Sequence, residues 1–159
     1  MKVILPGSYD PVTKGHLEII RYAAERYKAV YVVAFINESK TYRFTLEEKL
    51  EMLKIATRGM DNVIVDVYPG RVVDYMRLNG IDKIVKGYRN KQDLEWENVQ
   101  ADYNMSEGGF ATELVKCNAE FQNVSSTLVR SMLDAGKDAS ELLPEGVLDF
   151  IRMINNQEG

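Results

Sequence analysis

Residues 2–16 read Lys-Val-Ile-Leu-Pro-Gly-Ser-Tyr-Asp-Pro-Val-Thr-Lys-Gly-His, and this stretch decides the fold. Its first five residues form a short apolar run, which is typical of a buried strand. Over residues 17–24 the apolar side chains recur at helical spacing, with charged side chains between them. Gly7, Asp10-Pro11 and Gly15 favour a sharp turn between the two. The stretch therefore predicts a strand, a tight turn and a helix in direct succession.

The predicted turn has the chemistry of an anion site. Gly15 has no side chain to keep a ligand from the backbone, and the free N–H groups at a helix start favour negative charge. Ser8 and Thr13 add hydroxyl donors, and His16, the single histidine of the chain, can donate from its imidazole to a phosphate oxygen. The glycine spacing is neither the dinucleotide fingerprint nor the nucleoside-triphosphatase loop, because His follows the second glycine. Thr13-Lys14-Gly15-His16 instead resembles the Thr-x-Gly-His element with which the nucleotidyltransferase superfamily holds the triphosphate of a nucleotide.

Size and composition predict one domain without a membrane segment. A chain of 159 residues can bury a real core, so we expect a single domain over residues 1–159, with the last few residues frayed. No apolar run approaches the ~18 residues of a membrane span, and the apolar start is too short for a signal peptide. We therefore expect a cytoplasmic protein with no membrane partner.

The net charge and the cysteine content exclude further classes of protein. The net charge is -4 and the pI is about 5.1, which argues against a nucleic-acid partner, because such binding requires a basic surface. Any phosphate site must therefore be local. Cys117 is the only cysteine, so no internal disulfide and no cysteine-based metal site can form.

Strand-like and helix-like segments alternate along the chain. Apolar runs predict further strands at residues 29–36, 63–67, 81–86 and 112–116. Helices are expected after the capping box Thr45-x-x-Glu48, from Pro69-Gly70 to Asn79-Gly80, over residues 93–105, after a cap within residues 124–127, and from Pro144 onward. This alternation implies βαβ units and an α/β fold with a doubly wound, five-stranded parallel sheet. The turn at residues 7–16 then lies at the carboxyl end of the first strand, where such sheets bind ligands.

The helical spacing also predicts which side chains face the core. These are Leu46, Leu50, Leu53, Val72, Val73, Met76, Leu78, Leu128, Val129, Met132, Leu133, Val147, Phe150, Ile151 and Ile154.

Further polar motifs follow the predicted strands in order. Lys40 lies in the loop after the second strand, Lys86-Gly87-Tyr88-Arg89 follows the fourth, and Glu97 is on the next helix. Two residues separate the segment Val124-Ser125-Ser126-Thr127 from Arg130. Together with Thr13–His16, and in a chain of this length, these motifs resemble those of the bacterial phosphopantetheine adenylyltransferase family, over nearly all of residues 1–152.

The resemblance implies a Rossmann-like nucleotidyltransferase fold and a specific reaction. ATP and 4'-phosphopantetheine give dephospho-coenzyme A and pyrophosphate, a step of coenzyme A biosynthesis. The acceptor phosphate is already ionised at neutral pH, so no general base is required, and catalysis rests on in-line positioning and charge neutralisation. The resemblance also implies Mg²⁺ on the triphosphate, held largely through water, so no protein metal ligands are expected.

By the pattern of the family, catalysis would involve His16 at the α-phosphate, Lys40 beside the attacking phosphate, and Arg89 toward ATP. Ser8 would lie between the nucleotide and the pantetheine phosphate, Lys86 would face the pantetheine phosphate, and Val72 would line the pantetheine arm. The nucleotide would be held by Ser8, Tyr9, His16, Gly87, Tyr88, Arg89, Glu97, Phe121, Gln122, Asn123, Val124, Ser125, Ser126 and Thr127. The family also implies a homohexamer, with Tyr75 or Tyr103 available for subunit contacts.

Three positions depart from the pattern of the family. Ser8 replaces the commoner Thr but keeps the hydroxyl. Lys86 stands where Arg is usual, so a point charge replaces a planar two-pronged donor. Residues 118–123 differ from the usual aromatic-containing segment, which bears on adenine recognition. These departures affect the identity of the substrates more than nucleotidyl transfer.

Other functions stay open at this stage. A sister nucleotidyltransferase, acting on glycerol phosphate with CTP or on nicotinate or nicotinamide mononucleotide, would share the Thr/His-x-Gly-His element. Lys40 and Lys86 favour a terminal phosphate as the acceptor. A nucleotide-binding protein without turnover is the alternative from another class. Taken singly, Lys40 and Glu97 could be solvated charges, and Ser125-Ser126 could only cap a helix.

Overall fold

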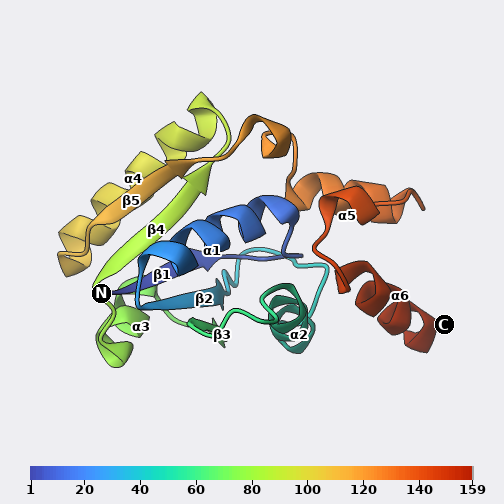
Figure 1. The fold of residues 1–159 in the computed structure, drawn as a ribbon, viewed down its shortest axis with the longest axis horizontal. Helices are drawn as coiled ribbons and strands as arrows, with labels where there is room; N and C mark the ends of the chain where they lie inside the picture. The colour runs from blue at the N-terminus through green and yellow to red at the C-terminus, as the bar shows by residue number, and fades with distance from the viewer. Residues whose placement is uncertain (159) are drawn as a thin grey trace.

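A parallel sheet of five strands runs through residues 1–158, the part of the chain that the computed structural model describes. The strands are β1 (Lys2–Gly7), β2 (Ala29–Phe35), β3 (Val63–Tyr68), β4 (Lys83–Tyr88) and β5 (Thr112–Lys116), in the spatial order β3–β2–β1–β4–β5. The central strand β1 pairs with β2 on one side and with β4 on the other (Figure 1). The chain thus winds from β1 toward both edges, and the predicted doubly wound, five-stranded parallel sheet is confirmed.

Helices cover both faces of this sheet. They are α1 (Lys14–Arg26), α2 (Leu46–Ala56), α3 (Val72–Asn79), α4 (Lys91–Gly108), α5 (Ser126–Asp134) and α6 (Val147–Glu158), with short 3-10 turns at Ala119–Phe121 and Ser140–Leu142. In Figure 1, α5 and α6 lie to the right of the sheet, beyond the end of β1 at which α1 begins. The helix α6 extends to Glu158, and Gly159, where fraying was predicted, lies outside the described residues.

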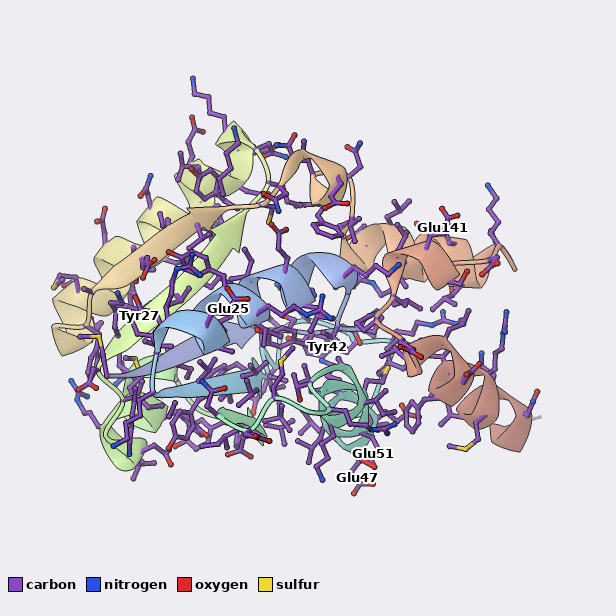
Figure 2. All side chains as sticks on the ribbon, in the orientation of Figure 1. Glu25, Tyr27, Tyr42, Glu47, Glu51 and Glu141 are labelled. Atoms are coloured by element: carbon purple, nitrogen blue, oxygen red, sulfur yellow. The ribbon has the colours of Figure 1, made fainter. Side chains whose placement is uncertain are left out.

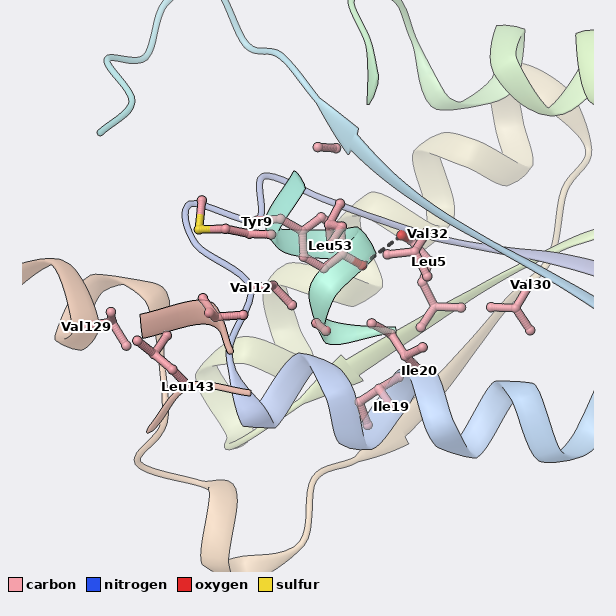
Figure 3. Close-up of a cluster of buried hydrophobic side chains, with 14 of the residues drawn as sticks. Leu5, Tyr9, Val12, Ile19, Ile20, Val30, Val32, Leu53, Val129 and Leu143 are labelled. Carbon is pink, nitrogen blue, oxygen red and sulfur yellow. Dashed lines mark hydrogen bonds between the residues drawn. The ribbon is translucent and has the colours of Figure 1, made fainter. Parts of the chain in front are cut away.

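Alternation along the strands sends successive side chains to different cores. Val3 and Leu5 of β1 pack in a cluster with α1, α2, α5 and α6, and Ile4 packs in a second cluster with α3. Figure 3 shows the first cluster, in which Leu5, Val30 and Val32 of the sheet lie beside Ile19 and Ile20 of α1. The face that carries α1 and α2 is called the α1 face below, and the other the α3 face.

Helix α2 begins where the capping box predicted. The Thr45 N–H donates to Glu48 Oε1 at 2.8 Å, and the Glu48 N–H donates to Thr45 Oγ1 at 3.1 Å. Glu47 and Glu51 point away from the sheet (Figure 2). The buried face differs from the prediction, because Lys49 and Met52 are buried beside the predicted Leu53.

Several predicted boundaries shift by one to three residues, and two of these shifts have a clear cause in the backbone. The fourth strand begins at Lys83 rather than Ile81, because Ile81 packs into the core immediately after the left-handed cap Gly80. The last helix begins at Val147 rather than Pro144, because Gly146, with a φ of 87°, interrupts the helical backbone between them.

One predicted core position on α3 is wrong. Leu78 is 72% exposed, and Tyr75 is buried on that helix instead. The Tyr75 hydroxyl donates to Asp66 Oδ2 at 2.9 Å, so this tyrosine belongs to the core of the subunit and is not available for a contact between subunits. No helix within residues 1–158 is both long and apolar enough to cross a membrane.

Candidate active site

Three loops meet at the carboxyl ends of the central strands. The turn of residues 8–13 follows β1, a loop that carries Lys40 follows β2, and the segment Arg89–Asn90 follows β4. Because β2, β1 and β4 are neighbours in the sheet, the topology places these loops side by side. Such a point, where the chain winds in both directions, is where open α/β sheets bind ligands.

Thr13 fixes the orientation of His16. The two residues form a capping box at the start of α1, in which the His16 N–H donates to Thr13 Oγ1 at 3.3 Å. The Thr13 N–H donates to His16 Nδ1 at 3.0 Å. Since Nδ1 accepts this hydrogen bond, the proton of the neutral imidazole is assigned to Nε2. His16 therefore presents an Nε2–H donor on the side away from Thr13.

The imidazole of His16 is electrically neutral. Burial, with smaller effects from the nearby positive charges of Lys86 and Arg89, lowers the pKa of His16 to about 3. The edge of the His16 ring meets the Tyr9 ring, with the ring centres 4.9 Å apart. His16 thus offers a hydrogen bond to an incoming anion without adding a formal charge.

His16 lines a cavity of about 240 Å³, here called the His16 pocket. Its walls are Thr13, Gly15, His16, Gly87, Arg89, Asp93, Cys117, Val124, Ser125, Ser126 and Thr127. Ser125 caps α5, since its Oγ accepts from the Leu128 N–H at 3.1 Å. The start of α1 and the start of α5 therefore both border the same cavity, and each brings N–H groups and hydroxyls that suit phosphate oxygens.

Arg89 is the cation of the His16 pocket. Its Nε donates to Asp93 Oδ2 at 2.8 Å, and its Nη2 donates to Asp93 Oδ1 at 3.3 Å. Although burial alone would raise it, these hydrogen bonds hold the pKa of Asp93 below its usual range. The only carboxylate that lines the pocket is thus ionised and neutralised by Arg89.

Gly87 is required by packing as well as by its place in the pocket. A Cβ at this position would lie 2.6 Å from Ile19 Cγ1 of α1. A Cβ at Gly15, in contrast, would meet nothing closer than 3.5 Å and would only narrow the pocket. Packing against α1 therefore requires glycine at position 87, whereas at position 15 glycine keeps the pocket wide.

Lys86 lines a second cavity of about 300 Å³, here called the Lys86 pocket. Lys86 Nζ donates to the Pro6 carbonyl at 3.0 Å and lies 3.6 Å from Glu97 Oε1. Burial raises the pKa of Glu97, while Lys86 opposes that shift. Ser8, Lys40 and Val72 also line this pocket, so all four residues predicted to bind the acceptor come together.

The pleat of β4 separates the two pockets. Lys86 reaches Glu97 of α4 on the α3 face, whereas the adjacent Gly87 faces Ile19 of α1 on the other side of the sheet. Two anions bound in these pockets would therefore approach each other over the carboxyl ends of β1 and β4.

Several predicted residues lie elsewhere. Glu97 was predicted to hold the nucleotide, and the structure places it in the Lys86 pocket. The Tyr9 side chain is buried and donates to the Leu5 carbonyl at 2.8 Å, the dashed line in Figure 3. Phe121 lines a surface groove beside α1. Tyr88, Gln122 and Asn123 line neither pocket.

Some pocket residues were not predicted from the sequence. Trp96, Gln100 and Asn104 extend from α4 along the Lys86 pocket, and the hydroxyl of Thr112 there is buried without a hydrogen-bond partner among the described residues. The polar side chains of Glu97, Gln100 and Asn104 recur at helical spacing, a signal that could have identified this face of α4. Asp93 could have been recognised in the same way, four residues after Arg89.

The described residues bring no three His, Cys, Asp or Glu side chains together as a metal site. What they do bring together is two anion pockets, one built from helix starts and a neutral imidazole, and one from lysines. An arrangement of this kind on a doubly wound parallel sheet defines a nucleotidyltransferase.

Comparison with known proteins agrees with this class. Residues 4–132 match the model of the cytidylyltransferase-like family. The chain is 38% identical over 151 residues to a phosphopantetheine adenylyltransferase of Thermobifida fusca, covering 95% of this chain and 92% of that protein. It is 41% identical over 147 residues to that of Corynebacterium diphtheriae, covering 92% of each. With that of Frankia alni it shares 37% identity over 155 residues, covering 95% of this chain and 96% of the relative. The chain belongs to the phosphopantetheine adenylyltransferase family of cytidylyltransferase-like proteins.

Proposed function

We propose that this protein transfers AMP from ATP to 4'-phosphopantetheine, giving dephospho-coenzyme A and pyrophosphate. The His16 pocket binds the triphosphate of ATP, and the Lys86 pocket binds the phosphate end of the acceptor. The observation that carries the proposal is the placement of Lys86 and Gly87, adjacent in sequence, in two different pockets whose polar groups suit phosphate oxygens. The family supplies the identity of the two substrates.

The transfer is a displacement at the α-phosphorus. An oxygen of the acceptor phosphate forms a bond to the α-phosphorus of ATP. The bond from that phosphorus to the oxygen that bridges the α- and β-phosphates breaks, and pyrophosphate is released. The attacking phosphate is an anion at neutral pH, so no side chain has to remove a proton. The work of the protein is to align two anions and stabilise the charge that spreads over the reacting oxygens.

The residues divide this work. The His16 Nε2–H donates to an oxygen near the α-phosphate, and Arg89 donates in the same pocket through the guanidinium N–H groups that do not bind Asp93. Ser125, Ser126 and Thr127 hold the outer phosphates from the start of α5. Lys40 and Lys86 hold the acceptor phosphate, and Ser8 lies between the two substrates. Val72 lines the wall along which the pantetheine arm extends.

Mg²⁺ enters with ATP as part of the substrate. The His16 pocket has one carboxylate, Asp93, which pairs with Arg89, so the donors that remain suit phosphate oxygens rather than a bare cation. Bound to the triphosphate, Mg²⁺ would supply positive charge that offsets the negative charge of the leaving pyrophosphate.

We further propose a cytoplasmic homohexamer. Trp96, Val99 and Tyr103 recur at helical spacing on α4 and are exposed by 62%, 57% and 47%. An apolar stripe of this kind on an otherwise polar helix is typical of a subunit contact. Tyr103 thus stays a candidate for such a contact.

An acceptor panel tests the reaction. Purified protein with ATP, Mg²⁺ and 4'-phosphopantetheine is expected to release pyrophosphate and form dephospho-coenzyme A. Glycerol phosphate with CTP, and nicotinate mononucleotide with ATP, serve as the competing substrates. Turnover only with one of these would establish a sister enzyme, and ATP binding without product from any acceptor would establish a non-catalytic nucleotide-binding protein.

A further inference from the structure

Three chain segments that carry the proposed reaction meet at one buried carboxylate, that of Asp10. Asp10 is 3% exposed and belongs to the turn between Gly7 and His16. The second segment is the loop of residues 37–44, here called the Lys40 loop. The third is α5, whose first residues line the His16 pocket. The further inference concerns what this carboxylate does, and it rests on the proposed function.

Asp10 fixes one end of the Lys40 loop. Its Oδ2 accepts from the Arg43 N–H at 3.0 Å, and its Oδ1 accepts from the Phe44 N–H at 3.0 Å. At the other end of the loop, the Asn37 N–H donates to the Tyr42 hydroxyl at 2.9 Å. Lys40 is exposed between these two points, so its reach into the Lys86 pocket depends on where they hold the loop.

Asp10 is also linked to α5, through its backbone. Arg130 Nη1 donates to the Asp10 carbonyl at 2.9 Å, and Arg130 Nη2 donates to Thr127 Oγ1 at 3.1 Å. Beside this link, Ser126 Oγ donates to the Pro11 carbonyl at 2.7 Å. Arg130 Nη1 also lies 3.8 Å from Asp10 Oδ2. The backbone of the turn thus contacts the nucleotide side, and the Asp10 carboxylate joins the acceptor side to Arg130 of α5.

A buried cation accompanies the carboxylate. Lys49 Nζ is 4.0 Å from Asp10 Oδ1, and the Lys49 side chain is 1% exposed. This nitrogen has no hydrogen-bond partner among the described residues, and it lies over the Tyr42 ring at 3.6 Å. Figure 2 shows Tyr42 beside α2. A buried ammonium without hydrogen bonds is costly, and Asp10 is the carboxylate that compensates it. Lys49 therefore contacts the two side chains that hold the loop, Asp10 through charge and Tyr42 through its ring.

We propose that Asp10, with Lys49 behind it, is a positioning residue of the transfer reaction that fixes Lys40 against the acceptor phosphate. Asp10 does not touch either substrate. It acts by holding the Lys40 loop at a set distance from the turn that carries His16, because both backbone donors at the end of the loop bind one carboxylate. Small displacements of a reacting pair are costly in rate, so an error of about 1 Å at Lys40 is expected to reduce turnover by up to about 100-fold.

A double-mutant cycle between Asp10 and Lys40 tests this role. Asp10→Asn removes the charge, and with it the ion pairs with Lys49 and Arg130, but leaves the backbone carbonyl to which Arg130 donates. We expect Lys40→Ala to reduce kcat by about 10–100-fold in the wild-type protein and by less than about threefold in the Asp10→Asn background, since Lys40 is then already displaced. His16→Ala is expected to cost the same factor in both backgrounds, because Thr13 holds His16 independently. Asp61→Asn, at an exposed site before β3, is the matched control.

The result that overturns the proposal is an equal cost of Lys40→Ala in both backgrounds. ATP affinity, measured by calorimetry, is expected to change by less than about threefold in Asp10→Asn, which separates a positioning role from general damage to the fold. If the wild-type protein itself forms no dephospho-coenzyme A, the proposed function fails, and this outcome is distinct from an uncoupled cycle in an active enzyme.

Two further measurements cover the case in which Asp10→Asn does not fold. Asp10→Glu keeps the charge beside Lys49 but moves the carboxylate by one methylene, so it is expected to weaken the dependence on Lys40 as well. In the wild-type protein the amides of Arg43 and Phe44 are expected to resist hydrogen exchange more strongly than those of Ser39 and Lys40. Equally fast exchange at all four would overturn the proposal without any variant.

Discussion

The His16 pocket and the Lys86 pocket are lined by different kinds of groups. The His16 pocket consists of helix starts, hydroxyls, a glycine and a neutral imidazole, whose positions are set by local hydrogen bonds such as that from Thr13 to His16. The Lys86 pocket consists of long side chains from several elements, among them Lys40, Lys86 and Glu97. Both pockets join distant parts of the chain, but most groups of the first are placed by the backbone around them, whereas those of the second are carried by long side chains. The difference explains how one protein can hold a common donor and a particular acceptor.

The largest expected effect is at His16. His16→Ala removes the one side-chain donor predicted to reach the α-phosphate, so kcat should fall by about 10²–10³-fold, as for a lost oxyanion donor. The affinity for ATP should change much less, because the starts of α1 and α5 remain. Steady-state kinetics and calorimetric titration with ATP measure the two quantities. A loss of ATP affinity with kcat unchanged would show instead that His16 binds the ground state and the transition state equally.

Lys86 should affect the other substrate. Lys86→Met keeps the length of the side chain but removes a charged donor, so the KM for the acceptor should rise by about 10–100-fold while the KM for ATP stays nearly constant. Lys86→Arg, which restores the residue usual in the family, is the charge-keeping control and should bind the acceptor at least as well as the wild type. Equal changes in both KM values would contradict the separation of the pockets.

Alanine at Gly87 and alanine at Gly15 are expected to have different effects on stability and on ATP binding. Gly87→Ala should destabilise the protein by about 1–3 kcal/mol, because the added methyl lies 2.6 Å from Ile19 Cγ1. Gly15→Ala should leave the melting temperature unchanged or slightly raised, since its nearest contact is 3.5 Å, and should weaken ATP binding instead. Thermal melting and ATP titration of both variants check this crossed pattern. A stable Gly87→Ala protein would remove the packing explanation.

Near neutral pH the smallest effect concerns the protonation of His16, and it grows as the pH falls. The pKa of His16 is lowered in the folded state from 6.5 to about 3, chiefly by burial, so below pH 6.5 the unfolded chain binds more protons than the folded one. Stability due to this group is therefore complete above pH 6.5 and declines as the pH falls, by up to about 1.4 kcal/mol for each pH unit. His16→Asn should flatten that dependence. Because the chain has a single histidine, NMR of its ring nitrogens reads the titration and the Nε2–H tautomer directly.

Contiguous sequence predicted most of the fold and of the His16 pocket. Strand five was placed at its observed bounds, and the capping box at Thr45 and the stop at Gly80 were correct, because each depends on neighbouring residues. Thr13–His16 and Ser125–Thr127 come together because each begins a helix at the same edge of the sheet.

The remainder depends on contacts that no local pattern encodes. The burial of Lys49 follows from a partner, Asp10, that lies 39 positions earlier in the chain. The placement of Glu97 in the Lys86 pocket follows from the angle at which α4 crosses β4 and β5, which helical spacing alone does not define. Leu78 is exposed because Tyr75 fills the corresponding space with a larger ring and a hydroxyl that finds Asp66.

The pleat of β4 also bears on how such enzymes can diversify. Since Lys86 and Gly87 face opposite sides of one strand, substitutions on the α3 face can select a new acceptor while the machinery that grips the triphosphate keeps its shape. In the course of evolution, the acceptor specificity of such an enzyme can therefore change through residues of one face of the sheet while nucleotide binding is retained throughout.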